Sequence, residues 1–309
     1  MISKDMMWLL GGVLAVLACA SLVSAWLHRR GGDAAFLENL RQRIATWWAM
    51  SAIFAFAALV GATGATLLFG LLSFLALREF ITLAPTRRGD HRALFWIFFV
   101  IAPLHYFFVA TGNYGMFSIL IPVYAFLFVP TRIALGGDTE GFLERAAKIQ
   151  WGLMVCVYCL GHAPALLVLK IPDYNGRNMS LLLFLVIVAQ LNDVLQYAWG
   201  KMLGKHKIAP AVSPNKTWEG FAGGTICASL IGACLWWATP FGFWAAGAMS
   251  LVITLMGFVG GLTMSAIKRD RGVKDFGQTL QGHGGILDRI DSLCFAAPVF
   301  FHLTRFFYT

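Results

Sequence analysis

The residues best suited to chemistry lie near the C-terminal end of the chain, between Ser265 and Ser292. Cations come first and could bind a polyphosphate; they are Lys268, Arg269, Arg271 and Lys274. Three glycines then flank His283, and glycine lets a backbone approach a ligand closely. These glycines are Gly282, Gly284 and Gly285. This order of cations, glycines and one histidine favours a nucleotide-phosphate site over a solvated loop of mixed charge.

Aspartates accompany this run. Asp275 precedes the glycine turn and Asp288 follows it. Asp291 is three residues beyond Asp288, which puts both carboxylates on one face if this part is helical. Such carboxylates suit Mg²⁺, which proteins bind through one or two carboxylates together with substrate phosphates. The segment therefore predicts a phosphate site that also holds a divalent cation.

A second polar segment runs from Ser213 to Gly220. Ser213 is a plausible N-cap, and the proline after it suits the first turn of a helix. The expected helix would expose backbone N–H groups beside Lys216 and Thr217, where a phosphate could bind. The alternative is an ordinary capped helix whose lysine extends to the membrane surface.

A third segment contributes Asp193, which lies inside the apolar stretch 178–199. A carboxylate there is costly unless it meets a cation, a metal or a water-filled cavity. Asn192 and Gln196 could add neutral polar groups to the same face. The alternative is a structural ion pair with a neighbouring lysine or arginine.

The elements that must position these residues are apolar. The chain has 309 residues, of which 59% are hydrophobic and 13% charged, and this composition points to the bilayer. Three uncharged segments are each long enough for two spans of about 20 residues; they are 44–77, 93–131 and 221–267. Single spans are expected over 7–27, 149–169, 178–199 and 292–308. We expect an all-α, polytopic integral membrane protein with about nine or ten transmembrane helices, because open sheet leaves its backbone unpaired in lipid.

The positions of lysine and arginine predict the orientation. The loops 28–43, 84–92 and 132–148 are basic, whereas the turns near 62–64, 111–114 and 238–241 carry no cation. The basic loops are expected in the cytoplasm, together with 200–219 and 263–291. The net charge of +9 does not indicate nucleic-acid binding, because the cations flank spans and show no interleaving with stacking aromatics. We expect an N-terminal transmembrane scaffold over 1–190 and a C-terminal catalytic region over 191–309.

The run from Ser265 to Asp291 closely resembles the signature of the phosphatidate cytidylyltransferase (CDP-diacylglycerol synthase) family. The segment from Ser213 to Gly220 resembles a second block of that family, and Gly204 and Lys205 precede it as expected. The resemblance covers roughly residues 190–292. Gln281 stands where the family usually has proline, and the segment 192–197 keeps the acid and the tyrosine but not the usual Gly-Ala pair.

The resemblance implies that CTP and phosphatidate react to give CDP-diacylglycerol and pyrophosphate, with Mg²⁺ or another divalent cation as cofactor. It implies an inner (cytoplasmic) membrane enzyme whose site faces the cytoplasm, with the lipid bilayer and a possible homodimer as partners. The expected catalytic residues are Asp275, Asp288, Lys274, His283 and Arg289. The expected substrate-binding residues are Ser213, Lys216, Thr217, Lys268, Arg269, Gly282, Gly284 and Gly285. The expected metal ligands are Asp193, Asp275, Asp288 and Asp291.

Two other readings stay open. Within enzymes, the chain could be a CTP-dependent lipid kinase or a cytidylyltransferase for another lipid phosphate. In a different class, it could be a membrane transporter with an anion-binding loop. The dense run of charges is expected at the membrane surface rather than along a path through the midplane, which disfavours transport.

Overall fold

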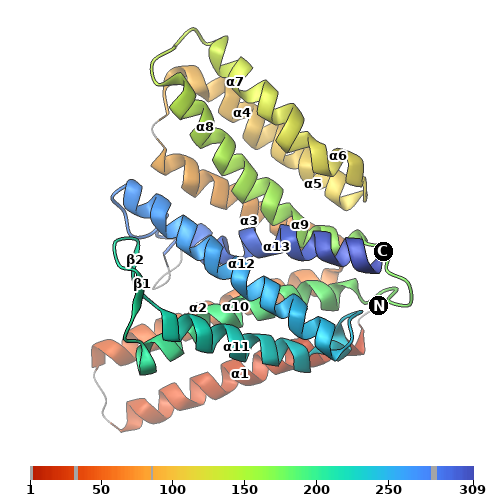
Figure 1. Ribbon diagram of the computed structural model, residues 1–309, viewed down its shortest axis with the longest axis vertical. Coiled ribbons are helices and arrows are strands. Elements are labelled where there is room, and N and C mark those ends of the chain that lie inside the picture. The colour runs from red at the N-terminus through yellow and green to blue at the C-terminus, as the bar shows by residue number, and fades with distance from the viewer. Residues whose placement is uncertain (1–2, 31–33, 85, 280–283) are drawn as a thin grey trace.

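The computed structural model describes residues 3–30, 34–84, 86–279 and 284–309, and it is almost entirely helical (Figure 1). The longest helices are α1 (Lys4–Arg29), α2 (Ala34–Val60), α3 (Ala62–Leu83), α10 (Asn178–Leu203), α11 (Trp218–Cys234), α12 (Phe243–Asp270) and α13 (Leu287–Tyr308). Shorter α-helices are α4 (His91–Trp96), α5 (Ala102–Ala110), α6 (Tyr114–Ile119), α7 (Phe126–Ala134), α8 (Phe142–Leu153) and α9 (Leu160–Ala165). Three π-helical segments join these short helices in pairs; they are Ile97–Ile101, Leu120–Ala125 and Met154–Cys159. Short 3₁₀ turns cover Arg88–Asp90, Leu166–Val168 and Trp236–Ala238.

Nine helical segments in the described part of the chain are long and apolar enough to cross a membrane. Helix α11 has 17 residues and is about 26 Å long, close to the hydrocarbon thickness of about 30 Å. Both chain ends lie on the same side of the bundle in Figure 1. Together with α11, the described residues hold ten candidate crossings, and the expectation of about nine or ten transmembrane helices is confirmed.

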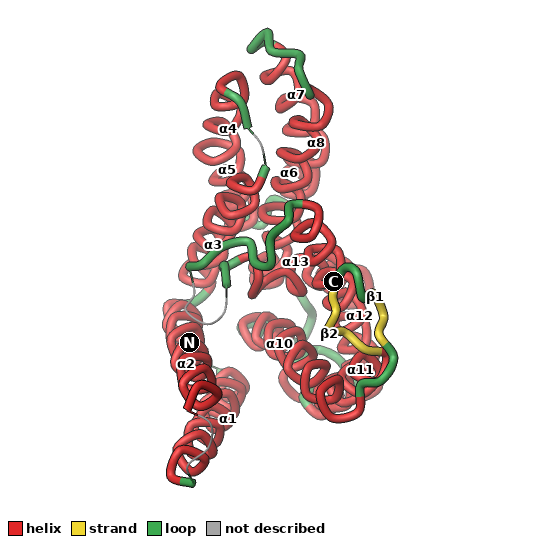
Figure 2. Tube along the Cα trace, turned by 90° about the vertical axis from the view of Figure 1, so that its left-hand side faces the viewer, coloured by secondary structure: helices red, strands yellow, loops and turns green. Residues whose placement is uncertain are grey.

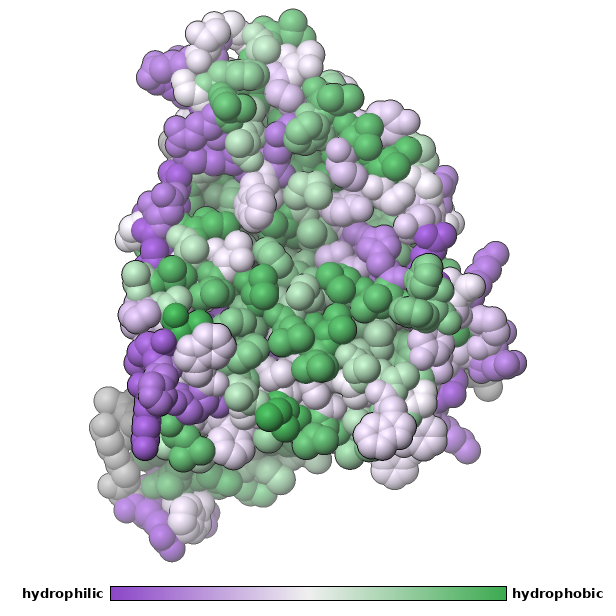
Figure 3. Space-filling view, in the orientation of Figure 1, coloured by the Kyte–Doolittle hydropathy of each residue, from purple (hydrophilic) through white to green (hydrophobic). Residues whose placement is uncertain are grey.

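The surface agrees with a membrane location. Apolar residues cover the middle of the face in Figure 3, while hydrophilic residues gather mainly along its two lateral edges. Large apolar side chains are exposed on many helices; examples are Trp8, Phe56, Leu67, Phe99, Leu127 and Trp244. Such contiguous apolar surface would be unfavourable in water, and lipid chains cover it in a bilayer. The protein is thus an integral membrane protein.

The helices form groups around α13. Figure 2 shows α4 to α8 at one end, the α1–α2 hairpin at the other, and α10, α11 and α12 together beside the centre. Helix α13 packs against both α12 and α9, and Phe300 and Ala297 on it are fully buried. Helices α10 and α11 approach closely because small residues lie between them: a Cβ at Gly224 would be 2.4 Å from Cγ of Gln196. The residue 190 boundary lies inside α10, and the division into two regions stays a prediction.

The polar segment before α11 differs from the expected helix. Residues Lys207–Ala209 (β1) and Ser213–Thr217 (β2) form a two-stranded antiparallel sheet, with Lys207 opposite Thr217. Helix α11 begins at Trp218, and its N-cap is Thr217, whose Oγ1 accepts a hydrogen bond from N–H of Gly220 at 3.1 Å. The prediction of a helix capped by Ser213 is therefore wrong. Proline is tolerated in an edge strand as well as in a first helical turn, and pairing with β1 decides between them here.

Candidate functional site

The charged residues predicted to carry chemistry gather at one end of the helical bundle, where α10, α12 and α13 meet the β1–β2 hairpin (Figure 1). Each of these elements supplies a part. Helix α10 carries Asp193, β2 carries Lys216, α12 carries Lys268, and α13 carries Asp288 and Asp291. Segments that are up to about 100 residues apart in sequence are thus brought to one place.

Asp288 is the most tightly held of these acids. Its Oδ1 accepts a hydrogen bond from Nζ of Lys268 at 2.7 Å, and the two side chains are 4% and 10% exposed. Its Oδ2 accepts hydrogen bonds from N–H of Phe276 at 2.8 Å and N–H of Gly285 at 3.0 Å. A buried carboxylate is stable only with such partners. The expectation that Asp288 and Asp291 lie on one helix is confirmed, since α13 begins at Leu287.

Asp193 contacts the same helix from α10. Its Oδ2 accepts a hydrogen bond from Oγ–H of Ser292 at 2.9 Å, next to Asp291 in sequence. The preceding residue, Asn192, donates to the carbonyl of Thr254 on α12 at 3.2 Å, and Gln196 donates to Asn192 at 2.9 Å. Polar side chains therefore connect α10 with both α12 and α13 at the level of the site.

Lys216 lies between these acids. Burial lowers the pKa of its ammonium group, the carboxylates of Asp193 and Asp291 act in the opposite direction, and Lys268 adds to the lowering. A Cβ built on Gly261 would be 3.0 Å from Nζ of Lys216 and 3.8 Å from Oδ2 of Asp291, so both groups approach the backbone of α12 at this glycine. Lysines and aspartates therefore alternate through the site.

Asp275 lies next to Asp288. A Cβ at Gly284 would be 3.0 Å from Oδ2 of Asp288 and 3.1 Å from Cβ of Asp275. Gly284 also has a φ of +79°, a conformation that favours glycine. Asp275 and Lys274 are exposed, whereas the side chain of Asp288 is buried. The pair formed by Asp275 and Asp288 therefore links the buried part of the site to its surface.

The remaining cations have mixed surroundings. Nε of Arg269 donates to the carbonyl of Val212 at 3.2 Å, and its Nη1 donates to the carbonyl of Val273 at 2.8 Å. Its guanidinium thus fastens the hairpin to the end of α12. Arg271 pairs with the neighbouring Asp270 at 2.7 Å. The backbone carbonyl of Arg289 accepts a hydrogen bond from Gln190 at 3.1 Å. Phosphate binding by Arg269 and Arg289 stays a prediction.

Three of the residues singled out from the sequence lie outside the described residues. They are Gln281, Gly282 and His283. The role predicted for His283, and the close approach predicted at Gly282, stay predictions. Ser213 and Thr217 lie in β2, and their predicted contact with substrate is also untested.

The aspartates form two pairs rather than one cluster. Asp275 adjoins Asp288, and Asp193 adjoins Asp291 through Lys216 and Ser292. Among the residues that the structure describes, no group of three or more acidic, histidine or cysteine side chains converges in the way a protein-only metal cage requires. Mg²⁺ is bound in proteins through one or two carboxylates with substrate phosphates, so the oxygen donors of either pair suit this ion, and the cofactor stays a prediction.

Glu79, on α3 in the N-terminal half, was not expected in the site. Its carboxylate accepts hydrogen bonds from N–H of Ile286 at 3.0 Å, from N–H of Leu287 at 2.9 Å and from Oγ1–H of Thr279 at 2.7 Å. The signal available in the sequence was an acid at the end of a long uncharged stretch, which is the same signal that identified Asp193.

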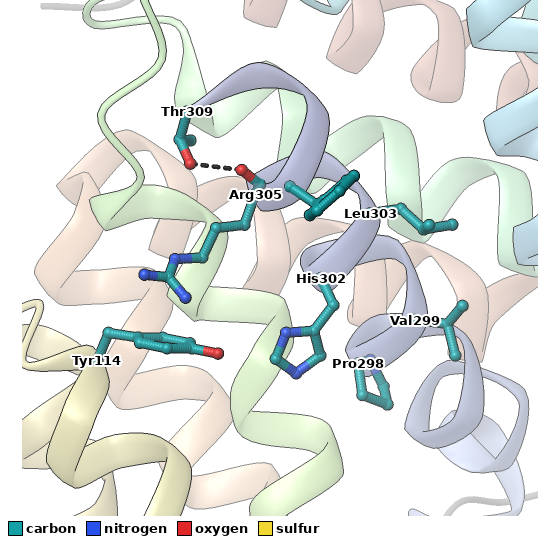
Figure 4. A pocket seen from close by; sticks show the side chains of 8 residues that line it. Tyr114, Pro298, Val299, His302, Leu303, Arg305 and Thr309 are labelled. Atoms are coloured by element: carbon teal, nitrogen blue, oxygen red, sulfur yellow. Dashed lines mark hydrogen bonds between the residues drawn. The ribbon is translucent and has the colours of Figure 1, made fainter.

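A cavity lies away from these residues. It has a volume of about 710 Å³ and lies beside the C-terminal part of α13, the opposite end from Asp288. Figure 4 shows the guanidinium of Arg305 over the ring of Tyr114, with His302 beside them; the guanidinium carbon is 3.3 Å from the ring centre. None of the residues predicted to act on substrate lines this cavity.

The described residues thus form a bundle of apolar, membrane-length helices with lysines and aspartates gathered at one end. The chain belongs to the cytidylyltransferase family, whose sequence model matches residues 41–307. It is accordingly a nucleotidyltransferase of the membrane.

Individual relatives narrow the comparison. The chain is 40% identical over 307 residues to a protein of Escherichia coli K12 named "Uncharacterized protein YnbB", covering 96% of this chain and 97% of that protein. It is 37% identical over 157 residues to a phosphatidate cytidylyltransferase of Staphylococcus aureus strain COL, covering 50% of this chain and 60% of that enzyme. A phosphatidate cytidylyltransferase of Staphylococcus saprophyticus is 39% identical over 129 residues, 41% of this chain and 50% of that enzyme.

Proposed function

We propose that this protein transfers the cytidylyl group of CTP to phosphatidate, giving CDP-diacylglycerol and pyrophosphate for phospholipid biosynthesis. The observation that carries the proposal is the buried Lys268–Asp288 pair with Lys216, Asp193 and Asp291 around it. The names of the staphylococcal relatives support the choice of phosphatidate.

The reaction requires no covalent bond between the substrates and the protein. A phosphate oxygen of the lipid bonds to the α-phosphorus of CTP, and the bond from that phosphorus to the bridging oxygen of pyrophosphate breaks. The attacking phosphate is already an anion, so no strong general base is required. Lys216, Lys268 and Lys274 would offset negative charge on the phosphates, and preorganised charge of this kind is usually the largest catalytic contribution.

The aspartates would hold Mg²⁺. Asp275 and Asp288 form one pair that fits this ion, and Asp193 and Asp291 form the other. The ion would supply positive charge to offset the phosphates of the nucleotide and the leaving pyrophosphate. Binding of the nucleotide would bring the remaining oxygen ligands.

The location suits one soluble and one lipid substrate. The site lies at the end of the bundle where the basic loops gather, which we place in the cytoplasm of the inner membrane. CTP would enter from water, whereas the acyl chains of phosphatidate would stay in the bilayer beside the helices.

Replacement of Asp288 tests the proposal. Asp288→Asn keeps the shape of the side chain but removes the charge beside Lys268, so transfer should fall by on the order of 10²-fold. The measurement is the rate at which label moves from α-³²P CTP into chloroform-soluble lipid, in membranes supplied with phosphatidate. Asp270→Asn is the matched control, because Asp270 is an exposed acid whose carboxylate pairs with the neighbouring Arg271.

The same assay separates the other readings. A lipid kinase would move label from γ-labelled CTP and none from α-labelled CTP. A cytidylyltransferase for another lipid phosphate would leave phosphatidate unlabelled and label an alternative acceptor. A transporter would show flux without pyrophosphate release. Near-normal transfer by Asp288→Asn would contradict the role given to this carboxylate.

A further inference from the structure

The carboxylate of Glu79 lies at the junction between the two halves of the chain. Its side chain belongs to α3, yet it accepts hydrogen bonds from Thr279, Ile286 and Leu287, some 200 residues later. The residue is 8% exposed, so water is a minor partner. Hydrogen bonds to an ionised carboxylate are about twice as strong as bonds between neutral groups, and these hold the turn before α13 against α3.

Three consecutive backbone N–H groups at the start of α13 donate hydrogen bonds to two different carboxylates. N–H of Gly285 donates to Asp288, whereas N–H of Ile286 and Leu287 donate to Glu79. The first amides of a helix have no partner within the helix. Glu79 therefore supplies acceptors for the first amides of α13, the helix that carries Asp288 and Asp291.

The glycines of this turn are explained by the same carboxylate. A Cβ on Gly277 would be 2.7 Å from Oε1 of Glu79, and a Cβ on Gly285 would be 2.4 Å from Oε2. Real Cβ atoms do not come this close to an oxygen, so either the Glu79 carboxylate or the glycine backbone would have to shift. Glycine at 277 and 285 thus makes room for Glu79, in addition to any room it leaves for substrate.

We propose that Glu79 is a positioning residue: it holds Gly277, Thr279 and the start of α13 in place, and so keeps Asp288 beside Lys268 and Asp275 for cytidylyl transfer. The catalytic part of the proposal rests on the proposed function. The holding of the turn stands on its own hydrogen bonds.

The first test replaces Glu79 with glutamine. The amide has the same shape, but its NH₂ group would face one of the backbone N–H donors, so one of the two amides loses its acceptor. A displacement of about 1 Å at a reactive group can cost on the order of 10²-fold in rate. We expect kcat for cytidylyl transfer to fall roughly 10- to 100-fold, with KM for CTP changed far less. Glu144→Gln is the matched control, since Glu144 is an exposed acid that pairs with Lys148.

Hydrogen exchange supplies a readout that does not depend on activity. The amides of Ile286 and Leu287 should exchange faster in Glu79→Gln than in the unaltered protein, while the helix α10 exchanges as before. If the unaltered protein transfers no cytidylyl group, the proposed function fails, and exchange alone still decides whether Glu79 holds the turn. Unchanged exchange at 286–287, or kcat within twofold of the unaltered protein, would overturn the positioning role.

A double replacement tests the contact itself. Gly277→Ala places a methyl group against the Glu79 carboxylate and should reduce transfer and lower the midpoint of thermal unfolding. The same replacement should cost much less in a Glu79→Ala background, because the obstructing carboxylate is gone. Equal effects of Gly277→Ala in both backgrounds would show that the two residues do not meet.

Discussion

Lys216 shows how the charges of the site act on one another. It lies on β2, outside the membrane-crossing helices, and burial lowers the pKa of its ammonium group despite the nearby Asp193 and Asp291. Its charge is therefore lost at a lower pH than that of an ordinary lysine. If Lys216 binds a phosphate of CTP, the loss of its positive charge lowers kcat/KM for CTP.

We expect kcat/KM for CTP to fall as the pH rises through this lowered pKa, below the ordinary lysine value of 10.5. The quantity kcat/KM reports the free enzyme, in which no substrate phosphate yet raises the pKa. In Lys216→Arg the guanidinium stays protonated, so the alkaline decline should move to higher pH. Lys207→Arg, at an exposed position of β1, should leave the decline where it is. The same alkaline decline in all three proteins would contradict the role of Lys216.

At the residue level, the sequence predicted the acids that stand out against apolar surroundings. Asp193 lies within a span, and Asp288 and Asp291 have helical spacing, so both signals were local. Glu79 has the same local signal, but its function depends on contacts some 200 residues away. The spacing of residues along the chain does not indicate such long-range contacts, because only the fold brings Glu79 next to residues 286 and 287.

At the scale of the elements, a buried ion pair joins the start of α4 to α8 at the basic end of the bundle. Nε of Arg145 on α8 is 3.2 Å from Oδ2 of Asp90, and the two side chains are 6% and 0% exposed. Nη2 of Arg145 also donates to the carbonyl of Asp138 at 2.9 Å, and N–H of Arg87 donates to Asp90 at 2.9 Å. This pair closes the helix group α4 to α8 at one end.

Arg145→Met should destabilise the protein strongly, because it leaves the Asp90 carboxylate buried without its cation. Removing one partner of a buried pair costs about 3–5 kcal/mol. The midpoint of thermal unfolding in detergent should drop, while Arg87→Met, at an exposed arginine that pairs with Asp138 and Glu140, should change it little. An unchanged midpoint for Arg145→Met would show that the pair contributes no net stability.

The spans were predictable because hydrophobic length is a property of each segment alone. The split of 93–131 into two crossings is confirmed by the turn between α5 and α6, and that of 44–77 by the break at Gly61. The β1–β2 hairpin was not predicted, because Ser213 and the proline after it suit a helix start as well as a strand. The backbone pairing of β1 with β2, with Glu219 accepting N–H of Lys205 at 3.1 Å, selects the strand.

For the whole molecule, the two sides of the bundle differ in charge. One side presents the basic loops, the hairpin and the site, and the other presents both termini and the turns near 61, 112 and 240 (Figure 1). The distribution of lysine and arginine predicts that the first side is cytoplasmic. The alternation was readable from the sequence because each loop contributes independently of its neighbours.

Labelling with a membrane-impermeant maleimide tests this orientation. Lys207→Cys on the hairpin should react in inside-out vesicles but not in right-side-out vesicles. Lys170→Cys, in the turn before α10, should show the opposite behaviour. The unaltered chain gives the background from its own cysteines. The reverse pattern would place the site outside the cytoplasm and remove its access to CTP.

The bond between Glu79 and the start of α13 also has a consequence for biosynthesis. Its partners at Ile286 and Leu287 are made 207 and 208 residues later. At synthesis rates of roughly 5–20 residues per second, about 10–40 s pass between the two events. Throughout that interval the carboxylate of α3 lacks the donors that it has in the finished protein, and a buried charge without partners is costly. A nascent chain can therefore complete the contact between α3 and the start of α13 only after Leu287 has been made, so the end of the bundle that carries the candidate site is completed late in synthesis.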